Sequence, residues 1–365
     1  MTLHLFNPEH DIALAAHLAH FTPPHAARQL KADLCWLPAL WASADDAVLV
    51  ENAAYARKAS SRRLKLLGRQ TPQFIERQQL AQLNITKVEP WGWDAALATD
   101  LKRWGLPADI LPDSALLEQY RQLSHRRTSA QLLPALRIAG TVGEAVECAT
   151  LEQVEDCLKR WGQIVIKSPW SSSGRGVRFC DAARLVNSEE LIMNNWVRNV
   201  IKAQGSVMVE PYYNKVKDFG MEFEVDKDGK VHYLGLSLFH TKNGAYIGNL
   251  LATEQAKREQ MARYVSIELL DEIKQRIIDN VHLTDYVGPF GIDMMICAAV
   301  QLNDNGKMIN DNRCLLHPCV ELNLRRTMGH VALSMTPTDD DIRKVMRIEL
   351  TDHYKLSIKK LGASA

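Results

Sequence analysis

Lys167 and the serines and glycines after it form a pattern that could bind phosphate. Lys167 ends an apolar segment, residues 164–167, whose alternation is that of a β-strand with Val165 and Lys167 on one face. The loop that follows is built of small residues: Ser171, Ser172, Ser173, Gly174 and Gly176. A cation on a strand beside free backbone N–H groups holds phosphate well. Taken alone, a hairpin turn with a solvent-reaching lysine accounts for the same residues.

Two acidic positions interrupt apolar, strand-like segments further along the chain. Asp293 lies in GIDMMI, and Glu321 and Asn323 lie in CVELNLRR. Glu321 and Asn323 are two residues apart, so a strand places them on the same face. Burying carboxylates is costly without a cation or partner, and two carboxylates with an amide oxygen suit Mg²⁺. Arg325 or Arg326 could neutralise a transferring phosphoryl group, or could simply pair with the carboxylates.

Composition limits the classes of protein that could carry these residues. The chain has 365 residues, 46% of them hydrophobic, and a formal net charge of +1, so no global field attracts it to nucleic acid or a membrane. Its seven cysteines are scattered without CxxC pairs, and we find no signal peptide and no apolar run of the ~20 residues that a membrane helix needs. We therefore expect a soluble cytoplasmic protein. Cys314, His317 and Cys319 fit no standard zinc spacing, and alternating burial in a strand explains them better.

The elements before residue 113 predict a small parallel α/β sheet. Residues 3–6, 47–50 and 85–90 read as strands, helical segments lie between them, and Asp11 can cap a helix that begins at Ile12. Ligands bind at the carboxyl ends of strands in such sheets. We therefore expect Glu9 and His10, just before a helix, to bind an anionic substrate end.

The rest of the chain predicts a mixed α+β region after a linker at 106–113. Thr150 and Gln153 form a capping box for a helix that ends at Gly162. A short helix and an edge strand near Tyr354 are expected after Thr336. The remaining expected elements are helices at 114–136, 188–204 and 254–280, strands at 206–210, 291–301 and 313–322, a hairpin of 221–225 with 231–239, and a polar loop at 303–312.

The order of these motifs resembles the ATP-grasp superfamily of carboxylate–amine and carboxylate–thiol ligases. The resemblance runs from about Ser124 to Leu333, and the small sheet before it resembles the domain that precedes ATP-grasp in that superfamily. It implies an N-terminal Rossmann-like α/β domain followed by a two-subdomain ATP-grasp fold. The implied regions are a pre-ATP-grasp domain at 1–113, a small subdomain at 114–212, a large subdomain at 213–335 and a C-terminal extension at 336–365.

The resemblance also implies roles for individual residues on the nucleotide side. Lys167 would contact the α-phosphate and the adenine side, and the loop 171–176 would fold over the other phosphates. Asp218 would bind the ribose, and Lys242, or else His240, would reach the γ-phosphate. Arg126 stands with Arg127 where many members have a lysine. The hinge that would hold the adenine edge consists of Glu210, Pro211, Tyr212 and Tyr213.

The catalytic side of the resemblance repeats what the residues indicate. Asp293, Glu321 and Asn323 would bind magnesium, and Arg325 or Arg326 would face the transferred phosphoryl group. The implied activity is an ATP-dependent ligase that activates a small carboxylate as an acyl phosphate for attack by an amine or similar nucleophile. Its cofactors would be ATP and Mg²⁺, with no nucleic acid or membrane partner. A kinase that phosphorylates a hydroxyl and a nucleotide-binding regulatory protein are the alternatives, and the sequence does not name the substrate.

Overall fold

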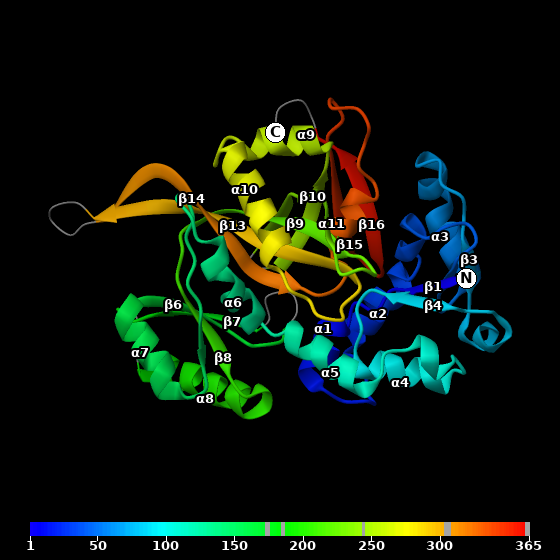
Figure 1. Cartoon of the computed structure of the whole chain (residues 1–365), viewed down its shortest axis with the longest axis horizontal. Helices are drawn as coiled ribbons and strands as arrows, with labels where there is room; N and C mark the ends of the chain where they lie inside the picture. The colour runs from blue at the N-terminus through cyan, green and yellow to red at the C-terminus, as the bar shows by residue number, and fades with distance from the viewer. Residues whose placement is uncertain (172–175, 184–186, 243–244, 303–307, 362–365) are drawn as a thin grey trace.

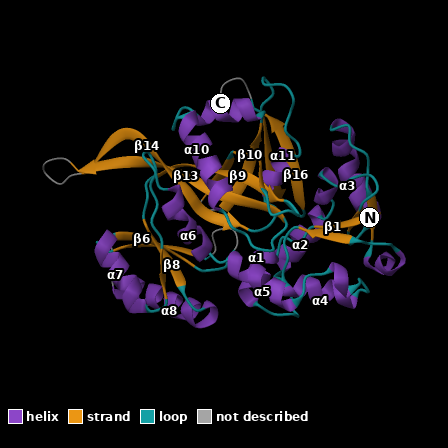
Figure 2. Cartoon of the chain, in the orientation of Figure 1, coloured by secondary structure: helices purple, strands orange, loops and turns teal. Residues whose placement is uncertain are grey.

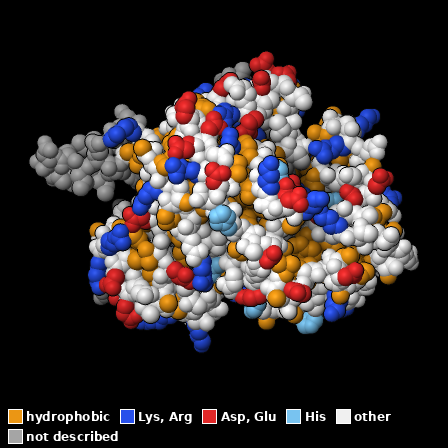
Figure 3. All heavy atoms as spheres, viewed as in Figure 1, with side chains coloured by type: hydrophobic (Ala, Val, Ile, Leu, Met, Phe, Trp, Pro, Cys, Tyr) orange, Lys and Arg blue, Asp and Glu red, His pale blue; other side chains and the backbone are white. Residues whose placement is uncertain are grey.

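The computed structural model describes residues 1–171, 176–183, 187–242, 245–302 and 308–361. Within these residues the strands form four sheets of four strands each. Figure 1 shows the N-terminal sheet on one side, a separate small sheet below, and the long β13–β14 hairpin extending from the central body. Helices lie around the sheets (Figure 2). Acidic and basic side chains are interspersed on the face seen in Figure 3, in keeping with the near-zero net charge.

The N-terminal sheet is parallel throughout and has the order β3-β2-β1-β4, which confirms the predicted α/β region. Its strands are short and buried, with Leu3, Val48 and Ile75 fully inaccessible. The helix expected from Ile12 begins at His10 instead, and Asp11 is not its cap. The elements are β1 (Thr2–Leu5), α1 (His10–Ala16), α2 (His25–Leu34), β2 (Ala47–Leu49), α3 (Ala53–Leu66), β3 (Gln73–Ile75), β4 (Lys87–Pro90) and α4 (Ala95–Arg103), with short 3-10 helices at Leu37–Leu40, Arg77–Gln82 and Ala108–Ile110.

The small sheet has the order β5-β8-β6-β7 and is antiparallel. Ile164 and Ile166 pack into a core with α7 and α8, so Lys167 lies on the opposite face, as the alternation predicts. The capping box of Thr150 and Gln153 is present. The elements are β5 (Val146–Cys148), α7 (Leu151–Trp161), β6 (Gln163–Lys167), β7 (Val177–Asp181), α8 (Asn187–Gln204) and β8 (Val207–Pro211).

The large sheet has the order β10-β9-β13-β14 and is also antiparallel. The single helix expected at 254–280 is wrong: Ser266 caps a second helix there with its side chain. β14 begins earlier than predicted, so 308–312 belong to the strand rather than to a loop, and 303–307 lie outside the described residues. The elements are α5 (Ser114–Leu123), α6 (Arg127–Leu136), β9 (Lys215–Val225), β10 (Val231–Ser237), α9 (Glu254–Met261), α10 (Ile267–Asn280), β13 (Gly288–Leu302) and β14 (Met308–Asn323).

The C-terminal residues complete a fourth sheet with the order β11-β12-β15-β16. An edge strand near Tyr354 is confirmed, whereas the short helix expected after Thr336 is replaced by a turn region and a strand. The elements are β11 (Phe239–Lys242), β12 (Ala245–Leu251), α11 (Met328–Leu333), β15 (Lys344–Leu350) and β16 (Tyr354–Lys360). Among the described helices, none is long and apolar enough to span a membrane.

β16 packs against the N-terminal part of the chain. Leu356 and Ile358 share one apolar core with Leu34 and Leu64 of α2 and α3. Asp33 accepts hydrogen bonds from the Tyr354 backbone N–H at 2.8 Å and lies 2.8 Å from a His353 ring nitrogen. The two ends of the chain therefore form one packed unit.

Candidate functional site

The large sheet brings the three predicted metal ligands onto one face. Asp293 on β13 lies opposite Glu321 on β14, and Gly291, two residues before Asp293, lies opposite Asn323. Residues two apart on a strand share a face, so the two pairs form adjacent rows. The Asn323 amide donates a hydrogen bond to Asp293 Oδ2 at 3.2 Å. Glu222 on β9 extends the Gly291–Asn323 row across a third strand.

Asp293 is a crowded carboxyl group. Burial and the negative charges of Glu321 and Glu222 raise its pKa to about 8, against the opposing effects of Arg325 and the Asn323 hydrogen bond. Carboxylates that repel one another in this way favour either a bound cation or a proton.

The same residues fit a magnesium ion by their chemistry. Two carboxylates and one amide offer the oxygen donors that Mg²⁺ prefers, and a half-turn of the Asn323 amide would present its oxygen. Within the described residues, no group of three or more His, Cys, Asp or Glu side chains is placed to hold a metal ion. The ion would therefore share its remaining positions with water or substrate phosphates, as Mg²⁺ commonly does.

Lys167 and Glu210 face each other on the small sheet. Val165 of β6 pairs with Glu210 of β8, so Lys167, two residues on, lies on the same face as Glu210. The Lys167 Nζ is 2.7 Å from Glu210 Oε1 and 2.6 Å from Oε2. Both side chains are buried, each residue being 7% exposed. A buried pair of this kind keeps a cation in a fixed place beside the loop that begins at Ser168.

Arg126 connects the small sheet to the metal-ligand candidates. Its Nη1 donates to the Ser168 carbonyl at 2.5 Å and to Ser171 Oγ at 2.8 Å, and its Nη2 donates to Glu321 Oε1 at 2.7 Å. Arg126 is 7% exposed and lies at the start of α6. The partner of Glu321 is therefore this distant arginine, and not Arg325 or Arg326 as the sequence alternative supposed.

The two arginines after Asn323 point to different places. Arg325 forms a two-pronged ion pair with Asp11, with Nε and Nη2 each 2.8 Å from a carboxylate oxygen. Burial acts to raise the pKa of Asp11, but the charge and hydrogen bonds of Arg325 outweigh it and lower that pKa. Arg326 lies over the Trp41 ring, 4.6 Å from its centroid, and 3.5 Å from Glu89. Arg326 is thus turned toward the N-terminal sheet, and only Arg325 lies beside the site.

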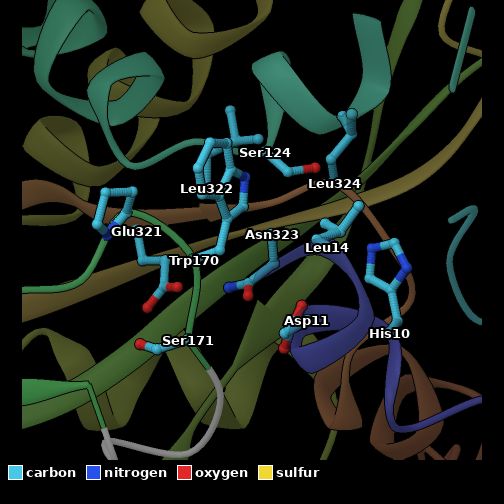
Figure 4. Close-up of a pocket in the computed structure, with 11 residues that line it drawn as sticks. His10, Asp11, Leu14, Ser124, Trp170, Ser171, Glu321, Leu322, Asn323 and Leu324 are labelled. Carbon is cyan, nitrogen blue, oxygen red and sulfur yellow. The ribbon is translucent and has the colours of Figure 1, made fainter. Parts of the chain in front are cut away.

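A narrow cleft lies between the N-terminal sheet, the small sheet and β14. Figure 4 shows Asn323 between Glu321 on one side and Asp11 and His10 on the other. The cleft is lined by His10, Asp11, Leu14, Ser124, Pro169, Trp170, Ser171 and residues 321–324 of β14 and its continuation.

The two residues predicted to bind substrate lie at different depths. His10 reaches the cleft wall, packs against Gly92, and has a ring nitrogen 3.5 Å from Asp94 Oδ2. Glu9 is buried, with Lys31 2.7 Å from Oε1, while Oε2 has no hydrogen-bond partner in the described part of the chain. The placement of His10 supports a substrate contact more directly than that of Glu9.

The predicted hinge begins at Glu210 near the end of β8 and continues past Pro211, the last residue of that strand. Tyr212 is exposed and packs edge-to-face on Phe179, with ring centroids 4.9 Å apart. The Tyr213 hydroxyl accepts a hydrogen bond from the Glu144 backbone N–H at 2.9 Å. The Tyr212 ring of the hinge is therefore exposed to solvent, whereas the Tyr213 ring is partly buried.

The remaining predicted nucleotide residues are only partly described. Asp218 accepts hydrogen bonds from Lys215 at 2.7 Å and Thr241 at 2.5 Å. The Gly176 carbonyl accepts one from the Ser168 N–H at 2.7 Å, which closes the base of the flap loop. Outside the described residues lie Ser172, Ser173, Gly174 and the side chain of Lys242.

Sequence reasoning missed two carboxylates at the site. Asp11 was expected as a helix cap, and no local feature indicates its pairing with a residue 314 positions away. Glu222 sits in MEFEV, where a carboxylate interrupts an apolar strand as Asp293 does, so the same pattern could have found it. Its Oε2 is 3.0 Å from His330 Nδ1, and a side chain at Gly291 would place its Cβ 2.5 Å from that oxygen.

Solved structures with a similar chain path identify the fold. N5-carboxyaminoimidazole synthetase from Staphylococcus aureus, complexed with ADP, matches 100% of this chain and 93% of its own length, with a TM-score of 0.52 and 12% sequence identity. The chain has the ATP-grasp fold. The resemblance predicted from the order of the motifs is thereby confirmed for the fold.

Two further solved structures match the chain with lower scores. A protein from Archaeoglobus fulgidus assigned to the ATP-grasp superfamily matches 99% of this chain and 100% of its own, at 11% identity and a TM-score of 0.49. N5-carboxyaminoimidazole ribonucleotide synthetase from Thermus thermophilus matches 96% of this chain and 83% of its own, at 13% identity and a TM-score of 0.47. No protein-family model matches the chain, and no curated protein matches it. The ATP-grasp fold hosts the site, and the reaction has to be argued from the site itself.

Proposed function

We propose that this protein is an ATP-dependent ligase that converts a small carboxylate into an acyl phosphate, which a nucleophile then attacks. The observation that carries the proposal is the Arg126 bridge. One buried guanidinium contacts both the base of the flap loop at Ser168 and Ser171 and the carboxylate of Glu321. A cation held between a phosphate-binding loop and a metal-ligand set is placed to stabilise negative charge on a phosphoryl group.

The small sheet supplies the nucleotide side of the proposed site. Lys167, fixed by Glu210, is the cation for the α-phosphate, and the segment from Glu210 to Tyr213 holds the base. Asp218 is the group for the ribose. The Staphylococcus aureus protein with this fold was solved in complex with ADP, which supports nucleotide binding by this protein. We divide the chain correspondingly into 1–113, 114–212, 213–335 and 336–365.

Asp293, Glu321 and Asn323 would hold magnesium. A bound magnesium ion supplies charge neutralisation for a transferring phosphoryl group. Arg126 sets the position of one of these charges, because its guanidinium holds the Glu321 carboxylate at 2.7 Å. Arg325 lies on the cleft side of this set, held by Asp11, and is the group that we assign to the carboxylate substrate or the phosphoryl oxygens.

The cleft at the carboxyl end of β1 is the proposed substrate site. It is bordered by His10 and Asp11 from the N-terminal region and by Glu321 and Asn323 from β14. A carboxylate oxygen bound there would attack the γ-phosphorus, the bond to the ADP oxygen would break, and the nucleophile would later displace phosphate. This chemistry depends mainly on positioning and charge neutralisation, which the described side chains provide.

A screen for phosphate release tests the proposal. Wild type and Glu321→Gln are incubated with Mg-ATP and pools of amino acids, dipeptides and hydroxy acids, and both free phosphate and ADP are measured. A ligase releases phosphate and ADP together only with a carboxylate and a nucleophile present, and Glu321→Gln loses this release. ADP without free phosphate, with a phosphorylated hydroxy compound, would identify a kinase instead. Nucleotide binding without either product in any pool would reject the ligase.

A further inference from the structure

His317 is a buried imidazole without a hydrogen-bond partner. It lies on β14 with 0% exposure, and neither Nδ1 nor Nε2 has a partner among the described residues. Leaving buried polar atoms unpaired is costly, so such groups in folded proteins call for an explanation. The alternation that predicted burial of this residue accounts for its position but not for its polar ring.

The surroundings of His317 come from both halves of the ATP-grasp fold. Its ring contacts Tyr213 edge-to-face, with centroids 5.3 Å apart, and a Cβ on Gly143 would lie 3.1 Å from its Nε2 and Cε1. Burial and the nearby charge of Lys167 lower the pKa of His317 to about 3. The ring is therefore neutral near pH 7, with one N–H donor and one acceptor nitrogen.

The backbone holds His317 firmly in this place. The N–H of the neighbouring Leu316 donates a hydrogen bond to the Gly140 carbonyl at 3.0 Å, and the Leu316 carbonyl accepts one from the Val142 N–H at 2.8 Å. On the other side, Met295 of β13 pairs with His317. The ring thus sits where β14, the 140–143 loop and the hinge residue Tyr213 meet.

We propose that His317 binds the exocyclic amino group of a purine base and so favours adenine nucleotides. The inference rests on the proposed function, which places the base between Lys167 and the hinge that ends at Tyr213. The acceptor nitrogen of the neutral ring would receive the 6-amino N–H of adenine, and the unpaired ring would gain in the complex the partner that it lacks without nucleotide.

The affinities of two nucleotides for wild type and for His317 variants test this assignment. Calorimetry measures binding of Mg-ADP and of the Mg complex of purine riboside 5′-diphosphate, which lacks the 6-amino group, to wild type and to His317→Phe. Wild type should bind ADP about fivefold or more tightly than the analogue, whereas His317→Phe should bind the two about equally. His317→Gln keeps a donor and an acceptor, so it should retain part of the preference, and it serves as the main variant if His317→Phe does not fold. The exposed His232→Phe is the matched control and should keep the wild-type ratio.

The melting temperature of the nucleotide-free protein gives a second readout. Because an unpaired ring is replaced by an apolar one, His317→Phe should melt at a higher temperature than wild type. An ADP preference that is unchanged in both His317→Phe and His317→Gln would overturn the assignment and leave a buried water as the partner. If wild type binds neither nucleotide, the proposed function itself fails, whereas binding of both without a preference rejects only the role of His317.

Discussion

The crowded carboxyl group of Asp293 makes the stability of the metal-free protein depend on pH in a defined direction. Its folded-state pKa of about 8 lies above the value of ~4 for an unfolded aspartate. The stability from this group is therefore fully present below pH ~4 and is lost as the pH rises toward 8. Over that range the unfolding free energy should fall by about 1.4 kcal/mol per pH unit.

Asp293→Asn removes this titration while keeping the shape of the side chain. Between pH 5 and pH 7 the unfolding free energy of wild type should fall relative to the variant by about 3 kcal/mol, and the variant should be the more stable protein at pH 7. Denaturant unfolding at pH 5, 6, 7 and 8 without metal measures the difference. Asp100→Asn, which alters a partly exposed carboxylate paired with Arg103 on α4, is the control and should run parallel to wild type.

A second measurement compares the stability of wild type and Asp293→Asn with and without Mg-ADP. Saturating Mg-ADP should restore much of the stability that wild type loses at pH 7 to 8, because a cation replaces the proton between Asp293 and Glu321. Asp293→Asn should gain far less from Mg-ADP. Parallel pH profiles for wild type and Asp293→Asn without metal would refute the reasoning, since Asp293 would then be an ordinary carboxylate with no need of a cation.

The remaining predictions concern the cations around the site and the substrate wall. Lys167→Met should weaken Mg-ADP binding about tenfold or more, and it should lower the unfolding free energy by about 3–5 kcal/mol because Glu210 is left buried without a partner. The double variant Lys167→Met/Glu210→Met should regain stability but not binding. If calorimetry finds wild-type affinity in Lys167→Met, Lys167 is not part of the site. Arg126→Leu should lower the metal-free unfolding free energy by roughly 3 kcal/mol, as measured in denaturant, and a neutral result would mean that its pairing with Glu321 is loose. Asp11→Asn should reduce activity with the substrate found by the phosphate screen while Mg-ADP affinity stays unchanged, and an equal loss of both would place Arg325 on the nucleotide. If Glu9→Ala and His10→Ala both leave substrate affinity unchanged, the cleft at β1 is not the substrate site.

Local patterns predicted those parts of the fold that local physics determines. The apolar runs at 3–6 and 47–50 could only be buried strands, and Thr150 with Gln153 marks a helix start by its own hydrogen bonds. The break between α9 and α10 was missed because residues 262–265 include no Gly or Pro, and only Ser266 signals a new start. The β15–β16 hairpin depends on packing against α2 and α3, which no local pattern reports.

The contacts in the candidate site also differ in whether the sequence could predict them. The pairing of Asp293 with Glu321 follows from two neighbouring strands, so the sequence could place these residues together. The Asp11–Arg325 and Arg126–Glu321 pairs join residues 314 and 195 positions apart, and only the assembled sheets bring them into contact. Charge alone did not distinguish Arg325 from Arg326, because both carry the same guanidinium group, and only their partners Asp11 and Glu89 in the assembled structure separate them.

The packing of β16 on α2 and α3 sets an order on folding during synthesis. Domains generally fold from the N-terminus as the chain emerges from the ribosome. Here the apolar face around Leu34 and Leu64 is covered by Leu356 and Ile358, which are translated roughly 290 residues after Leu64. The residues around Leu34 and Leu64 therefore keep part of their apolar core uncovered until β16 has been translated. This part of the nascent chain would then be a natural place for a chaperone to bind, and a product truncated before residue 350 would leave the apolar face around Leu34 and Leu64 uncovered.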